Sequence, residues 1–355
     1  MRKLLLLLLA VLLLTVCVAA YEVPEDFSGQ TLEAVMEEFR QANHLDTHNF
    51  SLCYYCPATG EEYAWNENWF SIAASTYKLP LNMYFYEMQQ AGEITGDTYI
   101  TWTGQTLDYI HEKSIVNSNN ELSEALMYYW GDHVSYKENM RKYFSMTDEE
   151  ISPLYWQANW YCTRMMMDCL KYLYENQESF EELIGYMKQA MPDRYFKQGV
   201  TEYEVAHKYG AVQTYHNDVG IIYTPQSFLL AVYTQGVSEG ICADAAELLT
   251  AWNLWQSAQN PVEPEPEEEP QEPEETTAGR PLQMDTVILP VPEEAPIPEE
   301  EPVPEEEPVA EPLPAPEPVV IPANVPQQQT TVFPLVAAVV AGLVLLLALI
   351  RKMRK

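Results

Sequence analysis

The chain has 355 residues and a formal net charge of −34, a balance that repels polyanions and excludes nucleic acid as a partner. Its length allows one large folded domain besides any tails. At the start, Arg2 and Lys3 precede an apolar stretch, Leu4 to Val16, and then the small residues 18–20. This pattern is typical of a signal peptide over residues 1–20, so we expect the rest of the chain outside the cytoplasm.

Residues 21–260 carry the periodic patterns of a folded domain. A helix is predicted over residues 31–43, where apolar residues recur on one side. Two strands around a hairpin turn, an apolar helix, a helical insert, three strands and a closing helix follow. We therefore predict an α/β (α+β) fold, with an antiparallel five-stranded sheet flanked by helices and an all-helical subdomain. The predicted elements after the first helix are 49–55, 62–66, 79–92, 120–129, 134–144, 161–174, 202–212, 216–224, 226–235 and 243–257.

The sequence after residue 260 has the pattern of a segment that tethers the folded domain to a membrane. Residues 261–331 form a Pro- and Glu-rich linker, which contains 19 of the 26 prolines and cannot bury a core. Residues 332–350 are an uncharged apolar run of 19 residues, long enough to cross a hydrocarbon layer of about 30 Å. The basic tail 351–355 marks the cytoplasmic side. We expect a single-pass protein of the cell membrane whose domain is extracellular and is held off the membrane by the linker.

Six cysteines occur, and five remain if the signal peptide is removed with Cys17. Cys53 and Cys56 have the spacing of a redox or zinc motif. However, they lie in an extended segment, where residues i and i+3 face opposite sides, and no second metal-type pair follows. Two states of the cysteines remain open, namely buried free thiols, or one or two disulfides. We expect neither a metal nor a cofactor.

The tetrad Ser75-Thr76-Tyr77-Lys78 carries the most chemistry. It precedes the apolar helix, so Ser75 lies near the unpaired N–H groups of a first helical turn. Lys78 lies on the same face one turn on, and burial favours its neutral form. A neutral amine beside a hydroxyl is a nucleophile with its own base. Taken alone, the tetrad favours a simpler role for Ser75, that of a helix cap.

Two further motifs change this interpretation: Ser118-Asn119-Asn120 at a turn and Lys208-Tyr209-Gly210 in a strand. With Ser75-x-x-Lys78, they resemble the Ser-x-x-Lys, Ser-x-Asn and Lys-Thr-Gly motifs of the class A β-lactamase and penicillin-binding serine hydrolase family. The three motifs follow the family's order, and the resemblance covers about residues 30–255.

The resemblance implies a role for each motif residue. Ser75 would attack a carbonyl and become acylated, Lys78 would take its proton, and Ser118 would relay this proton to the leaving nitrogen. Lys208 would attract a substrate carboxylate and help to keep Lys78 neutral. The implied substrate-binding residues are Asn120, Tyr209, Gly210 and Ala211, and the backbone N–H groups of Ser75 and Ala211 would form the oxyanion hole.

Three departures from the family pattern bear on substrate and turnover. Asn119 stands where the family often has Asp, and Tyr209 stands where it has Thr or Ser. The Glu-x-x-x-Asn element that activates the hydrolytic water in class A β-lactamases is not evident, because neither Glu149 nor Glu150 has an Asn four residues on. We therefore expect acylation of Ser75 followed by slow deacylation.

The predicted function is that of an exported, membrane-anchored serine hydrolase that forms an acyl-enzyme on Ser75. Its partner would be a β-lactam or a D-Ala-D-Ala-type stem peptide of peptidoglycan. One alternative is a weak or inactive wall-binding module that kept the fold, which the many Tyr and Trp residues suit. A thiol–disulfide enzyme using Cys53 and Cys56 has the least support. We expect His216 to make a structural contact.

Overall fold

The computed structural model describes residues 21–100, 102–157 and 159–261. The predicted signal peptide, almost all of the linker, and the predicted membrane helix with its basic tail lie outside these residues. Among the helices of the described part, none is long and apolar enough to span a membrane.

The centre of the domain is one antiparallel sheet of five strands in the order β2-β1-β9-β8-β7. It confirms the prediction of a five-stranded sheet assembled from both ends of the domain. Every residue of β9 is buried, as expected for an apolar strand in the middle of a sheet covered on both faces. The strands are β1 (Phe50–Cys56), β2 (Glu61–Trp65), β7 (Val205–Val212), β8 (Tyr215–Ile222) and β9 (Phe228–Thr234).

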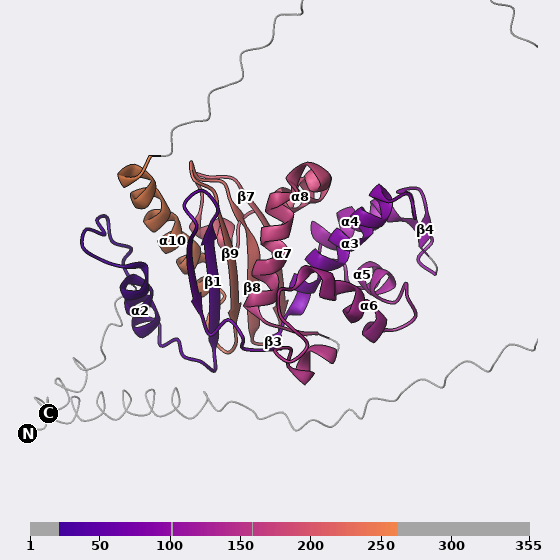
Figure 1. Cartoon of the computed structure of the whole chain (residues 1–355), viewed down its shortest axis with the longest axis horizontal. Coiled ribbons are helices and arrows are strands. Elements are labelled where there is room, and N and C mark those ends of the chain that lie inside the picture. The colour runs from indigo at the N-terminus through magenta and orange to yellow at the C-terminus, as the bar shows by residue number, and fades with distance from the viewer. Residues whose placement is uncertain (1–20, 101, 158, 262–355) are drawn as a thin grey trace, which may run out of the picture. The chain divides into compact units, whose positions relative to one another are not determined.

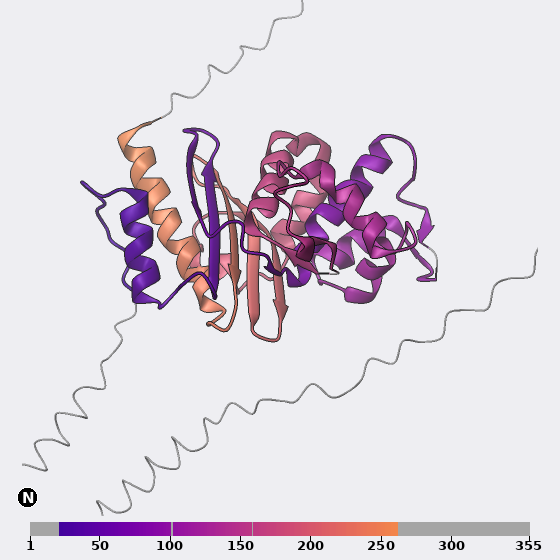
Figure 2. The ribbon, with the colours of Figure 1, turned by 60° about the horizontal axis from the view of Figure 1, so that its bottom comes forward.

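Helices cover both faces of the sheet (Figures 1 and 2). On one face, α2 (Leu32–Ala42) and α10 (Gly240–Gln259) share an apolar cluster with the strands, which also includes α9 (Phe196–Gly199). On the other face, α7 (Thr163–Glu175) packs against the sheet and joins a second cluster that extends into the helical subdomain. The mixed α/β fold with a helical subdomain is therefore confirmed.

The helical subdomain is the insert between β2 and β7, and it lies beyond α7 in Figure 1. Its helices are α3 (Lys78–Gln90), α4 (Leu107–Ile115), α5 (Asn120–Met127), α6 (His133–Met140) and α8 (Glu181–Gln189). Short 3₁₀ turns are Ala74–Tyr77 (η1), Arg141–Tyr143 (η2), Pro153–Trp156 (η3) and Gln177–Phe180 (η4). Two short ribbons pair β3 (Ser71–Ile72) with β6 (Trp160–Tyr161), and β4 (Tyr99–Ile100) with β5 (Gln105–Thr106).

The five described cysteines are buried free thiols. Cys53 contacts the Thr163 hydroxyl at 3.5 Å, whereas Cys56 contacts the carbonyl of Gln226 at 3.8 Å. Burial raises the pKa of the Cys53 thiol to about 12, which leaves it a poor nucleophile at neutral pH. The described part of the chain also holds no cluster of His, Cys, Asp and Glu side chains arranged for a metal ion. These observations argue against thiol–disulfide chemistry at Cys53.

One further lysine, which belongs to none of the motifs, is also buried. Lys137 on α6 is fully buried, and its Nζ donates to the carbonyl of Trp160 at 3.1 Å. Nζ also lies 3.5 Å from the ring centroid of Tyr161 and 4.3 Å from that of Tyr155. Each aromatic face returns about 2 kcal/mol, whereas burying an ammonium costs several kcal/mol. Burial therefore prevails, and the pKa of Lys137 lies well below its usual value.

Replacing this lysine is expected to stabilise the fold. The unfolded chain binds a proton at Lys137 up to pH values near 10.5, while the native chain releases it at lower pH. Since the unfolded state then binds more protons, the free energy of unfolding of the wild type should rise with pH over that interval. Lys137→Met should raise the free energy of unfolding by about 1–3 kcal/mol near pH 7 and remove this pH dependence.

Urea unfolding followed at several pH values measures both effects. Lys113→Met, which changes a partly exposed lysine on α4, is the control and should change neither quantity. An equal loss of stability for Lys137→Met at all pH values would instead mean that the rings hold a charged ammonium.

Candidate active site

Ser75 lies in the 3₁₀ turn η1, just before α3, and not in the first turn of an α-helix as predicted. The preceding Ala74 has φ = +50°, a left-handed conformation that costs an L-residue about 1–3 kcal/mol. Hydrogen bonds hold the turn, because the Thr76 hydroxyl donates to the carbonyl of Ala73 at 2.9 Å and lies 2.6 Å from the Tyr233 hydroxyl on β9. The strained turn presents a partly exposed Ser75 between the sheet and the helical subdomain.

Strand β7 passes directly alongside this turn. A Cβ atom on Gly210 would lie 2.7 Å from the Ala73 carbonyl oxygen and 2.8 Å from the Ser75 nitrogen, so only glycine permits the approach. The approach brings the backbone of Gly210 next to that of Ser75, with the exposed Ala211 following in the strand. An oxyanion hole formed by the N–H groups of Ser75 and Ala211 requires this proximity.

Lys78, the first residue of α3, is fully buried. Its Nζ donates to the Ser118 carbonyl at 2.6 Å and to Asn120 Oδ1 at 2.8 Å, and it lies 3.3 Å from Ser118 Oγ. Burial lowers the pKa of Lys78 to about 7, although the charge of Glu124 acts in the opposite direction. A substantial fraction of this lysine is therefore neutral at neutral pH and able to accept a proton.

Lys208 on β7 reaches the same serine from the opposite side. Its Nζ donates to Ser118 Oγ at 3.0 Å and to the carbonyl of Tyr209 at 2.8 Å. Complete burial and the nearby charge of Lys78 keep the pKa of Lys208 well below its usual value, while Asp218 raises it. Ser118 therefore bridges two buried amines, which places a hydroxyl between two groups that can exchange protons.

The Ser-Asn-Asn loop owes its shape to two local features. Ser118 has φ = +54°, and both its carbonyl and its hydroxyl face Lys78. Asn119 caps α5, because its Oδ1 accepts from the N–H of Leu122 at 2.9 Å. An amide therefore organises this loop where the family often has a carboxylate.

Tyr209 makes contacts that a Thr or Ser at this position would not make. Its ring stacks on Tyr195, with centroids 5.4 Å apart and planes at 22°, and it lies 4.1 Å below the Lys208 Nζ. Burial raises the pKa of the Tyr209 phenol. The aromatic pair thus forms one wall beside the two lysines.

Sequence reasoning missed the polar residues that support Lys78. Asn82 donates to the Lys78 carbonyl at 2.6 Å and to Ser114 Oγ at 2.9 Å, and its Oδ1 lies 2.7 Å from His111 Nδ1. Ser114 in turn lies 2.9 Å from Ser123 on α5. This buried chain ties α3 to α4 and α5. The available signal was the four-residue spacing from Lys78 to Asn82, which places both residues on one helix face.

Sequence reasoning also missed a buried pair behind β7. His207 Nδ1 lies 2.7 Å from Asp218 Oδ2, and its Nε2 donates to the carbonyl of Ala190 at 2.9 Å. Lys197 donates to the same carbonyl at 2.6 Å. Because successive strand residues point to opposite faces, this pair supports the strand from behind while Lys208 faces Ser118. No short motif connects His207 with Asp218, since only strand register pairs their strands.

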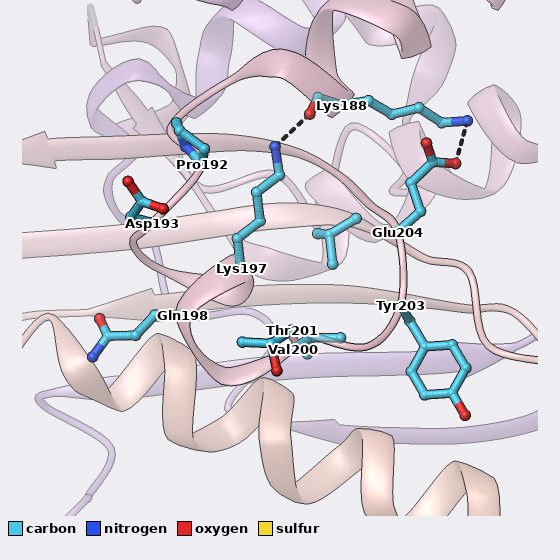
Figure 3. Close-up of a pocket in the computed structure, with 10 residues that line it drawn as sticks. Lys188, Pro192, Asp193, Lys197, Gln198, Val200, Thr201, Tyr203 and Glu204 are labelled. Carbon is cyan, nitrogen blue, oxygen red and sulfur yellow. Dashed lines mark hydrogen bonds and ion pairs between the residues drawn. The ribbon is translucent and has the colours of Figure 1, made fainter.

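A cavity of about 520 Å³ opens beside this buried pair and away from Ser75. In Figure 3, Lys197 reaches across it to the backbone of Lys188, whose own ammonium pairs with Glu204 at 2.7 Å. Lys188, Lys197 and Glu204 of this cavity thus pair with one another or with the backbone. Its lining includes none of the motif residues.

Two other residues considered in the sequence have clear positions. Glu150 is held by the N–H of Thr147 at 2.8 Å and by Arg164 at 3.1 Å. His216 pairs with Ala211 across β7 and β8, and its carbonyl accepts from Thr234. The motif residues Ser75, Lys78, Ser118, Asn120, Lys208, Tyr209, Gly210 and Ala211 thus come from η1, α3, the loop before α5, α5 itself and β7, and the contacts above bring these elements together.

The comparisons agree with this geometry. The family described as the β-lactamase enzyme family matches residues 31–120 and 106–252, so the chain belongs to this family. No curated protein matches the sequence.

Solved structures share the fold. The last common ancestor of Gram-negative bacteria β-lactamase class A is 18% identical, with a TM-score of 0.54 over 62% of this chain and 99% of that one. A β-lactamase from Sphaerobacter thermophilus is 19% identical, with a TM-score of 0.51 over 65% of this chain and 100% of that one. The structure of PBP-A is 15% identical, with a TM-score of 0.51 over 64% of this chain and 97% of that one. At these identities the likeness establishes the fold alone.

Gly210→Ala tests the close approach of β7 to η1. The new methyl group would collide with backbone atoms, so we expect a loss of about 1–3 kcal/mol in the free energy of unfolding. Gly185→Ala on α8 is the matched control, because its added Cβ meets nothing within 4 Å and alanine favours a helix. Urea unfolding of both variants measures the difference, and equal stabilities would contradict the packing described for η1.

Proposed function

We propose that this protein is an exported, membrane-anchored serine hydrolase that forms an acyl-enzyme on Ser75. The substrate would be a β-lactam or a D-Ala-D-Ala-type stem peptide of the cell wall. One observation carries the proposal: two buried lysines, Lys78 and Lys208, contact the hydroxyl of Ser118 beside the strained turn of Ser75. Membership of the β-lactamase enzyme family supports it.

In the proposed reaction, the Ser75 hydroxyl attacks the amide carbonyl carbon and transfers its proton to the neutral Lys78. The oxyanion of the tetrahedral intermediate is stabilised by the N–H groups of Ser75 and Ala211. Lys78 returns the proton through Ser118 to the leaving nitrogen, which breaks the C–N bond. The ester on Ser75 then persists until water attacks it.

The substrate carboxylate and amide have separate binding groups in this proposal. Lys208 in its charged form would attract the carboxylate while Lys78 is neutral, and Asn120 meets the amide side chain of the substrate. Tyr209 lacks the small hydroxyl that the family uses beside the carboxylate, and its ring offers a flat apolar wall instead. A substrate with an extended apolar or peptide group next to its carboxylate suits such a wall.

Export and anchoring are proposed from composition alone. The signal-like residues 1–20, the acidic Pro-rich linker 261–331 and the apolar run 332–350 support a domain tethered outside the cell membrane. A wall substrate lies within reach of such a tether.

A second candidate is a wall-binding module without turnover. Among residues 21–100, 102–157 and 159–261, no hydrogen bond joins Ser75 Oγ to Lys78, whose donors contact Ser118 and Asn120 instead. A module of this kind would bind stem peptides through Lys208 and the aromatic wall, and it would keep its affinity without Ser75.

Ser75→Ala separates the two candidates. The wild-type chain should gain the mass of a penicillin on incubation, while Ser75→Ala should gain none, because the nucleophile is gone. Intact-mass spectrometry and a fluorescent penicillin measure the adduct, with Ser238→Ala on the surface as the control. Equal labelling of Ser75→Ala would contradict Ser75 as the nucleophile. Unmodified wild type that still binds wall peptide favours the module.

The pH dependence of acylation should report Lys78. Because its pKa is about 7, the amine is protonated below this value and cannot accept the proton of Ser75. The labelling rate should therefore fall about tenfold per pH unit below pH 7 and level off above it. Labelling reactions quenched at timed intervals between about pH 5 and pH 8 measure how the rate depends on pH. A rate that does not change with pH would exclude Lys78 as the base.

A further inference from the structure

Helix α5 carries a carboxylate on the side of the helix that meets Lys78. Asn120 is the first residue of α5, and its Oδ1 accepts from Lys78 Nζ at 2.8 Å. Glu124 follows four residues later and so lies on the same helix face, with Cβ atoms about 5–6 Å apart. A glutamate side chain is long enough to reach back along this face toward the amine.

The helix spacing sets Glu124 one turn after the residue that binds Lys78, and the directions of two pKa shifts agree with this position. The charge of Glu124 raises the pKa of Lys78 against the larger effect of burial, and it adds to the burial that raises the pKa of the Tyr77 phenol. Glu124 thus acts on Tyr77, the last residue of η1, and on Lys78, the first residue of α3. Its side chain is exposed, and within the described part of the chain it forms no hydrogen bond or ion pair.

Other carboxylates near the motifs are engaged or face elsewhere. Glu150 is bound by Thr147 and Arg164. Asp218 is buried and accepts from His207 and from backbone N–H groups. Glu121 lies one residue after Asn120, about 100° around the helix. Glu124 combines a free carboxylate with a place on the face that meets Lys78.

We propose that Glu124 is the general base that activates water to hydrolyse the acyl-enzyme, an inference that rests on the acylation of Ser75 proposed above. The water oxygen bonds to the ester carbonyl carbon while its proton passes to the Glu124 carboxylate. The tetrahedral intermediate then collapses, and the bond from carbon to Ser75 Oγ breaks. Ser75 Oγ takes up a proton, supplied from Glu124 through Lys78, and the acid product leaves. The chain is on this basis a hydrolase with turnover and not only a penicillin-binding protein.

The experiment separates acylation from deacylation in the full-length chain. A pulse of benzylpenicillin labels Ser75, excess penicillin is destroyed, and intact mass follows the decay of the adduct. Glu124→Gln should acylate within about threefold of wild type and lose its adduct about 100-fold more slowly, because a general base contributes about 10²–10⁴-fold. Glu121→Gln removes the same charge from the same helix and should behave as wild type.

Chemical rescue distinguishes a base from a structural residue. Glu124→Ala should also retain its adduct, and added formate should speed the decay by about tenfold or more, because the small carboxylate can occupy the vacated position. A purely structural role would leave formate without effect.

Each contrary result overturns a defined claim. Unchanged decay in Glu124→Gln, an adduct on wild type that never decays, or an equal fall in acylation and deacylation overturns the role of Glu124 alone. A higher KM with unchanged decay means that Glu124 binds a cationic substrate group, which also overturns it. A wild-type chain that forms no adduct on Ser75 overturns the proposed function and this inference with it.

Discussion

Two buried amines that share one serine hydroxyl are the constraint on which the site depends. Neither Lys78 nor Lys208 has a carboxylate bonded to its ammonium within the described residues, and the hydrogen bonds of both amines go to carbonyl, amide and hydroxyl oxygens. Two unpaired ammonium ions cannot both stay charged in such a place at low cost. Burial ordinarily destabilises a lysine. In this site it also favours the neutral amine beside the proposed nucleophile. Lys137 shows the same cost without any hydroxyl to activate.

This arrangement exists only in the folded chain, because its parts come from distant segments. The sheet supplies Lys208 from β7, the helical subdomain supplies Ser118 and Asn120, and η1 joins the two. Gly210 lets β7 approach η1, and Tyr233 of β9 holds the same turn from the sheet. The strain at Ala74 and Ser118 is sustained by these contacts, since a short peptide would relax both residues. The geometry of Ser75 and the packing at this junction are consequently coupled.

The sequence was sufficient for the architecture and for the motif residues, because strand alternation, helix periodicity and three short motifs are all local signals. The sequence did not predict the features that depend on long-range packing. Ser75 was expected in a first α-helical turn, whereas the bonds of Thr76 to Ala73 and Tyr233 impose a 3₁₀ turn. The stacking of Tyr209 on Tyr195 and the pairing of His207 with Asp218 depend on loop placement and strand register, which no motif encodes.

The hydrolytic base is another feature that a local sequence motif does not locate. A sequence pattern such as Glu-x-x-x-Asn assumes that the base comes from one particular segment, but proton transfer depends only on where the carboxylate lies. Helix α5 already places Asn120 on Lys78, and helical geometry then orients Glu124 toward the same region without any further motif. Glu150, which lacks the Asn of that pattern, is held by Arg164. Under the proposed role of Glu124, the nucleophile turn and the two lysines would fix the ester, and the water could then approach from α5.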